Sequence, residues 1–67
     1  MELIVNGERK MVPEGITAVK LLEHLKVQPE QVVVEVNLEI VKRAQLAGTM
    51  LKDGDQVEIV RLVGGGS

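Results

Sequence analysis

The sequence predicts an α+β domain: a mixed sheet of four to five strands with one main helix packed across one face. Three observations support this prediction. They are an Asn-Gly turn inside residues 2–12, one amphipathic segment at residues 17–26, and strand-like runs at residues 32–36, 39–41 and 56–63. A single helix cannot cover both faces of a sheet, so it packs on one. We expect the first and last strands to be parallel neighbours in the centre of the sheet.

The composition limits what this domain can be. The chain has 67 residues, close to the lower size at which a hydrophobic core holds a fold without metal or disulfides. It has no cysteine, which excludes disulfides and thiol chemistry and fits a reducing compartment. The apolar fraction of 45% is aliphatic, with no Phe, Tyr or Trp. Twelve valines and four isoleucines favour strands.

Charge and hydropathy argue against two kinds of partner. Without aromatic side chains the chain lacks a stacking platform for single-stranded nucleic acid, and its net charge of −2 disfavours contact with phosphates. No apolar run is long enough to span a membrane, and the N-terminus does not follow a secretory pattern. We therefore expect no nucleic acid, no membrane and a cytoplasmic location. The acidic balance suits docking to a basic protein partner.

The first half of the chain contains a predicted hairpin and the predicted helix. Asn6-Gly7 favours a type I′ turn, which requires positive φ at both central residues. The helix is expected at about residues 17–26, with Thr17 as its N-cap. Pro29 prevents much continuation. The apolar stripe of this predicted helix consists of Ala18, Leu21, Leu22 and Leu25.

The second half is predicted to supply the remaining strands. Residues 32–36 are almost entirely valine, and Asn37 supplies a turn before a short strand at residues 39–41. Residues 44–49 are ambiguous between a loop and a single helical turn. A tight turn at residues 52–55, which contains Asp-Gly-Asp, then leads into the last strand.

Alternation along the last strand predicts an exposed apolar pair. If Val57 and Ile59 point toward the helix, then Glu58, Val60 and Leu62 face the solvent, because successive side chains lie on opposite faces. Two large aliphatic side chains on a solvated face indicate a partner-docking surface at Val60 and Leu62. The alternative is that a neighbouring loop covers them.

The chain ends in Gly64-Gly65-Gly66-Ser67. A run without Cβ atoms can enter a narrow cleft and present its main-chain carboxylate to another protein's active site. The alternative interpretation is a flexible linker or a cloning remnant, since linkers share this composition. We therefore divide the chain into one domain at residues 1–63 and a flexible glycine-rich tail at residues 64–67.

Other candidate sites are weak. Asp53 and Asp55 are too few for a calcium loop, and turn formation explains both. His24 has no second zinc ligand near it, and Ser67 has no general base. No metal site and no catalytic residue is predicted. The chain is expected to be a carrier or substrate of other enzymes, without enzymatic activity of its own.

Taken together, these features resemble the ThiS family, the small sulfur carriers of thiamine (thiazole) biosynthesis. The resemblance extends over essentially the whole chain. It lies in the Asn6-Gly7 hairpin, the amphipathic helix, Val34-Glu35-Val36-Asn37, Ile40-Val41 followed by Arg43, Asp53-Gly54-Asp55 and Val63-Gly64-Gly65-Gly66. It implies a ubiquitin-like β-grasp fold.

The resemblance also implies a reaction cycle. A ThiF-type adenylating enzyme uses ATP to activate the carboxylate of Gly66, supported by Gly65, and a persulfide donor protein converts the adenylate to a thiocarboxylate. Thiazole synthase (ThiG) then accepts the sulfur. The carrier itself binds no cofactor.

Three positions depart from the family pattern. Leu38 stands where glycine is frequent, Lys42 stands where proline is common, and Ser67 follows the terminal glycines. Ser67 is removed by a protease, is a cloning residue, or leaves this carrier inactive. Three alternative functions stay open: sulfur delivery to molybdopterin synthase, a β-grasp interaction module without tail chemistry, and a protein-modifying tag.

Overall fold

The computed structural model describes residues 1–62, and the predicted tail at residues 64–67 lies outside the described residues. Residues 1–62 form one sheet, one α-helix and two short 3₁₀ helices. In chain order the elements are β1 (Glu2–Val5), β2 (Glu8–Met11), α1 (Ala18–His24), η1 (Pro29–Gln31), β3 (Val32–Val36), β4 (Glu39–Val41), η2 (Arg43–Gly48) and β5 (Gln56–Arg61).

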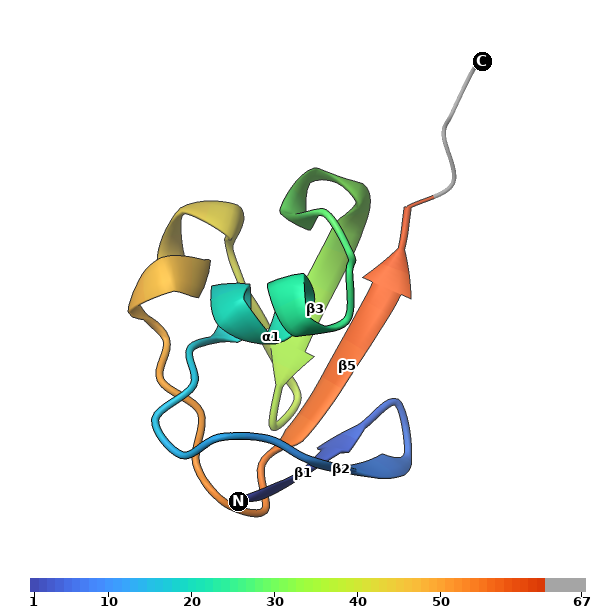
Figure 1. Cartoon of the computed structure of the whole chain (residues 1–67). Helices are drawn as coiled ribbons and strands as arrows, with labels where there is room; N and C mark the ends of the chain where they lie inside the picture. Colours follow the sequence, from blue (N-terminus) through green and yellow to red (C-terminus); the bar gives the residue numbers. More distant parts are fainter. Residues whose placement is uncertain (63–67) are drawn as a thin grey trace.

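The five strands form a mixed sheet in the order β2-β1-β5-β3-β4. β1 and β5 are parallel neighbours near the centre, which confirms the prediction for the first and last strands. The other three pairings are antiparallel. α1 lies across one face of this sheet and is seen in front of β3 in Figure 1. The opposite face, here called the outer face, carries no helix among residues 1–62.

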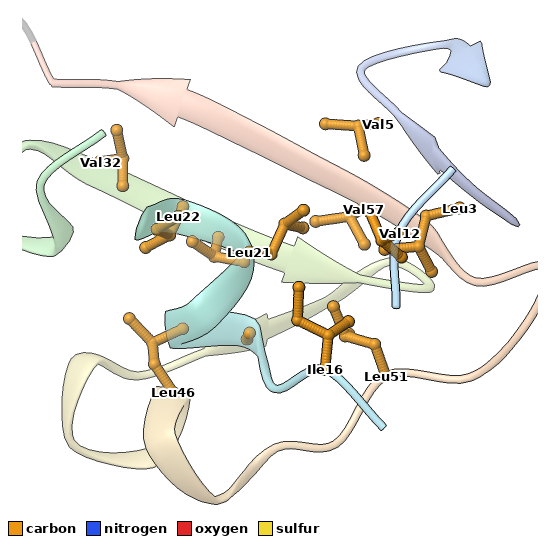
Figure 2. Close-up of a cluster of buried hydrophobic side chains, with 12 residues drawn as sticks. Leu3, Val5, Val12, Ile16, Leu21, Leu22, Val32, Leu46, Leu51 and Val57 are labelled. Carbon is orange, nitrogen blue, oxygen red and sulfur yellow. The ribbon is translucent and has the colours of Figure 1, made fainter. Parts of the chain in front are cut away.

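Aliphatic side chains from the helix and the sheet form the core. Leu21 and Leu22 of α1 are 1% and 0% exposed, and Val57 of β5 is 0% exposed. In Figure 2 the two leucines point from the helix toward the sheet. Leu46 and Leu51, from the segment between β4 and β5, complete the core on the other side of α1. The predicted helical stripe is therefore the buried face of α1.

Residues next to the helix determine where α1 begins and ends. The hydroxyl of Thr17 accepts a hydrogen bond from the backbone amide of Lys20 at 3.3 Å, which confirms Thr17 as the N-cap. Leu25 is the C-cap, and Lys26 follows with φ of 60°. The regular helix is thus somewhat shorter than the predicted residues 17–26. The 3₁₀ helix η1 begins at Pro29, because proline fits the first position of a helical turn.

The segment that the sequence left ambiguous is helical. η2 occupies Arg43–Gly48, and it places Leu46 in the core at 3% exposure. The burial of this one leucine gives the short helix its position against α1. β5 ends at Arg61, and Leu62 is the last described residue.

Candidate functional site

β5 is the strand that leads toward the C-terminus, and its two neighbours hold it along its length. β3 pairs with it from Val32–Arg61 to Val36–Val57. Beyond the strand, the backbone amide of Leu62 donates to the carbonyl of Gln31 at 2.7 Å. The position at which the chain leaves the sheet is therefore fixed by a backbone hydrogen bond.

Two asparagines in hairpin turns also contact the backbone next to or within β5, one from each side. Asn6, in the β1–β2 turn, bonds with its side chain to both the amide and the carbonyl of Ile59. Asn37, in the β3–β4 turn, accepts from the amide of Gln56 at 3.0 Å. Both residues have positive φ, 51° and 52°. Their places in the sequence predict turns, but they do not predict these bonds, which join distant parts of the chain.

The outer face of the sheet exposes aliphatic side chains close to the end of β5. Val60 is 53% exposed and Leu62 is 50% exposed, so their predicted exposure is confirmed and the covering-loop alternative is wrong for the described chain. Val33 lies directly opposite Val60 on β3. Ile40 on the edge strand β4 is 66% exposed. We call Val33, Ile40, Val60 and Leu62 the outer apolar patch.

Two carboxylates lie at the edge of this patch, in the row next to Val33 and Val60. The β3–β5 register places Glu35 directly opposite Glu58, and the β3–β4 register places Ile40 beside Glu35. Both ion pairs found within residues 1–62 lie elsewhere, at Lys10–Glu8 and Lys20–Glu23. Alternation along the last strand predicts Glu58 on this face, but the sequence does not predict Glu35 beside it, because strand register is a long-range property.

A groove of about 370 Å³ lies on the other side of β5, next to the helix. Its floor is aliphatic, from Leu25, Val27 and Ile59, and its rim includes Lys10 and Arg61. The Lys10 ammonium lies 3.9 Å from the Glu8 carboxylate, and the Arg61 guanidinium donates to the Gln31 side chain at 3.4 Å. No group in it has the arrangement of a nucleophile and its base.

The remaining polar candidates have structural roles or are exposed. Asp53 accepts a hydrogen bond from the amide of Glu2 at 2.7 Å, and Asp55 accepts from the amide of Lys52 at 2.8 Å. The bond from Lys52 confirms the turn interpretation of Asp55, whereas the bond from Glu2 joins Asp53 to the start of β1, 51 positions away. His24 is exposed at the end of α1.

The predicted reactive end lies beyond the described chain. Gly64, Gly65, Gly66 and Ser67 are outside the described residues, so their predicted roles stay predictions. Within residues 1–62, no helix has the length and apolar character needed to cross a bilayer.

Comparisons with known proteins agree on the family. The model of the ThiS family matches residues 2–66. The sulfur carrier protein ThiS of Escherichia coli is 30% identical over 66 residues, which cover 98% of this chain and 100% of that protein. A crystal structure of a thiamine biosynthesis protein (ThiS) from Geobacter metallireducens superposes with a TM-score of 0.86 at 43% identity, covering 98% of this chain and 100% of that one.

A second kind of relative is longer. A thiazole synthase of Paramagnetospirillum magneticum is 43% identical over 67 residues, which are 100% of this chain and 21% of that protein. Another thiazole synthase, from Magnetococcus marinus, shows 38% identity, and the match covers 20% of its length. This chain therefore spans about a fifth of these two relatives. Because the family model matches nearly the whole chain and a ThiS structure superposes over its full length, the chain belongs to the ThiS family and has its β-grasp fold.

Proposed function

We propose that this protein is a sulfur carrier of thiamine biosynthesis, and that its sulfur travels on the main-chain carboxylate of Gly66. The observation that carries the proposal is the family match over residues 2–66 together with the full-length similarity to a sulfur carrier protein. The composition supports it, since a chain without cysteine has no thiol on which to carry sulfur. This chemistry requires a free carboxylate on Gly66. Gly65 and Gly64 have no side chains, so this thin segment can enter a partner's active site.

The chemistry follows from the weakness of a carboxylate as an electrophile. A ThiF-type adenylating enzyme transfers AMP from ATP to the Gly66 carboxylate and releases pyrophosphate. The terminal sulfur of a persulfide donor attacks the acyl carbon, and AMP leaves. A thiol then cleaves the resulting acyl disulfide and leaves a thiocarboxylate on Gly66. In this cycle the carrier is a substrate and not an enzyme, and ATP is bound by the partner.

The acceptor that we propose is thiazole synthase (ThiG). Two thiazole synthases contain a segment similar to this whole chain, which supports a functional interaction between the carrier and the synthase. Delivery to molybdopterin synthase is the alternative within the same fold. We place this cycle in the cytoplasm, where thiols stay reduced, and assign nucleic acid and membranes no part in it.

The docking surface that we propose is on the outer face. Val60 and Leu62 are half exposed beside the point where the chain leaves the sheet. An enzyme that contacts them is positioned to receive the residues that follow Leu62. Exposed aliphatic groups of this size are typical of protein contact sites.

The test is intact mass spectrometry of the chain ending at Gly66, incubated with ATP, the adenylating enzyme of the source genome and a persulfide donor. We expect one sulfur to replace one oxygen. A matched chain that ends at Gly64 keeps the folded domain and should show no exchange. The full chain with Ser67 should also stay unmodified until the serine is removed.

The same experiment separates the alternatives. A pure interaction module keeps its partner binding when residues 65–67 are deleted, whereas a carrier loses its function. Adding thiazole synthase or molybdopterin synthase to the loaded carrier identifies the acceptor by loss of the added sulfur. Absence of sulfur from Gly66 with every cognate partner would contradict the proposal.

A further inference from the structure

The dipeptide Asn6-Gly7 in the β1–β2 turn has a reactivity of its own, separate from its role in the fold. In an Asn-Gly sequence the glycine nitrogen can attack the side-chain carbonyl carbon of the asparagine, because no Cβ on the glycine hinders the approach. A new C–N bond closes a five-membered succinimide ring, the Cγ–Nδ2 bond breaks, and ammonia leaves with the proton of the glycine amide. Water then opens the ring at either carbonyl, which gives aspartate or isoaspartate. Both residues are exposed, so water reaches them.

The folded turn keeps the reacting groups of Asn6 and Gly7 on opposite sides of a bond. β1 and β2 pair at Val5–Glu8, so these two residues form a two-residue turn, with φ of 51° and 83°. Such angles belong to a type I′ turn, in which ψ of the first central residue is about 30°. At this ψ the Cβ of Asn6 lies nearly opposite the Gly7 nitrogen about the Cα–C bond. Ring closure needs the two atoms on the same side, so the turn must open before Asn6 reacts.

Ile59 of β5 holds this turn in place through the asparagine side chain. The Ile59 amide donates to Oδ1 of Asn6 at 2.8 Å, and the Ile59 carbonyl accepts from Nδ2 at 3.3 Å. The backbone amide of Asn6 also donates to the carbonyl of Val57 at 2.9 Å. Nδ2 is the group that leaves as ammonia, so its bond to Ile59 must break during the reaction. The contact between the turn and β5 therefore protects the site.

We propose that Asn6-Gly7 is a site of spontaneous deamidation, that the folded turn and Ile59 suppress the reaction, and that deamidation weakens the contact with β5. Aspartate lacks a donor for the Ile59 carbonyl and brings a negative charge close to that oxygen. Isoaspartate adds one main-chain carbon, so β1 and β2 lose the two-residue turn that sets their register. Because ammonia is lost to the solvent, the reaction does not reverse. This modification is independent of the sulfur chemistry at Gly66.

Asn37 is a control within the same chain. It also begins a two-residue turn, between Val36 and Glu39, and its φ of 52° matches that of Asn6. The next residue is Leu38, whose Cβ and branched side chain hinder attack by its nitrogen. The sequence contains these two asparagines and no other, so both can be followed in one sample.

The test follows the mass gain of replacing NH by O in tryptic peptides of the full chain, after incubation at mildly alkaline pH in buffer and in guanidinium chloride. Trypsin separates Asn6, in residues 1–9, from Asn37, in residues 27–42. We expect Asn6 to deamidate at least about tenfold faster in denaturant than in buffer, because the reaction requires opening of the turn. Asn37 should change little in either. Asp53-Gly54 can form the same ring, but its reaction leaves the mass unchanged.

Two variants test the chemistry and its consequence. Gly7→Ala adds a Cβ next to the attacking nitrogen, where no atom lies within 4 Å of it, and it should slow the deamidation of Asn6 several-fold in denaturant. Turn strain in the folded state plays no part in that comparison. Asn6→Asp reproduces one product, and its midpoint in urea unfolding should be lower than that of the wild type. The isoaspartyl form, separated by ion exchange, should show faster hydrogen exchange at the Ile59 amide.

Three results would overturn the proposal. Equal deamidation rates of Asn6 in buffer and in denaturant would show that the turn and Ile59 give no protection. An Asn6 that does not react in denaturant would exclude the site. Deamidated protein with an unchanged urea midpoint and unchanged exchange at Ile59 would show that the contact with β5 does not depend on the amide. Sulfur loading of Gly66 is measured separately, so each of these results leaves the carrier function standing.

Discussion

The side-chain amide of Asn6 pairs with the backbone of Ile59 as if it were a further residue of β1. Its Oδ1 accepts from the Ile59 amide at 2.8 Å, and its Nδ2 donates to the Ile59 carbonyl at 3.3 Å. The backbone amide of Asn6 also donates to the carbonyl of Val57 at 2.9 Å. One turn residue thus extends the contact between β1 and β5 beyond the end of the ladder, on the strand that leads to the tail.

Replacing Asn6 with glycine isolates this contact. Glycine keeps the positive φ of the turn, so the expected loss comes from the two side-chain hydrogen bonds. We expect Asn6→Gly to lower the free energy of unfolding by about 1–2 kcal/mol, measured by urea denaturation. Asn6→Asp keeps the acceptor for Ile59 and should lose less. Equal stability of the glycine variant and the wild type would show that the bonds contribute nothing.

Leu38 adopts a left-handed backbone conformation with φ of 72°, and its side chain is 83% exposed. An L-residue with a Cβ is strained in this region, and the exposed side chain offers little packing in return. We expect Leu38→Gly to raise the unfolding free energy by about 0.5–1 kcal/mol. Leu38→Ala keeps the strain and should match the wild type. A less stable glycine variant would indicate that the leucine side chain packs in solution.

Leu22 tests how much the helix–sheet core contributes. It is 0% exposed on the buried face of α1, and truncating a buried leucine to alanine costs about 2–5 kcal/mol. For a domain of this size, that loss is a large part of the total stability. We expect Leu22→Ala to show a strongly lowered midpoint in thermal unfolding. Met50→Ala, at a residue that is 63% exposed, is the control and should change the midpoint little.

Val60 tests the proposed docking surface without disturbing the fold. Val60→Thr keeps the β-branched shape on an exposed strand position, so the unfolding free energy should change by less than about 0.5 kcal/mol. The KM of the adenylating enzyme for this variant should rise several-fold. Met11→Thr is a matched control, since Met11 is 73% exposed on the edge strand β2. Equal KM values for the two variants would contradict docking at Val60.

The features that sequence analysis predicted correctly depend on neighbours in the chain. Asn6-Gly7 specifies its own turn through backbone preference, and Thr17 caps its own helix. The alternation in β5 correctly placed Val60 on the exposed face, because successive residues in a strand point to opposite sides. The fold class followed from the number and order of such elements.

The features that the sequence did not predict depend on residues far apart in the chain. Glu35 faces Glu58 only because β3 and β5 pair in one register. A shift of one residue would move the side chains of the shifted strand to the opposite face of the sheet. Asn6 reaches Ile59 across 53 positions of sequence. Leu46 gives η2 its place by packing in the core, which no signal near residues 43–48 specifies.

The sequence by itself therefore determined the class of fold, the helix with its buried stripe, the exposed aliphatic pair on the last strand and the glycine end that carries the proposed chemistry. Only the tertiary structure decided which charges meet on the outer face and which side chains hold β5 in place. The physical reason is that turns, caps and alternation are short-range properties of the backbone. Strand register and side-chain contacts across the sheet result from packing the whole chain.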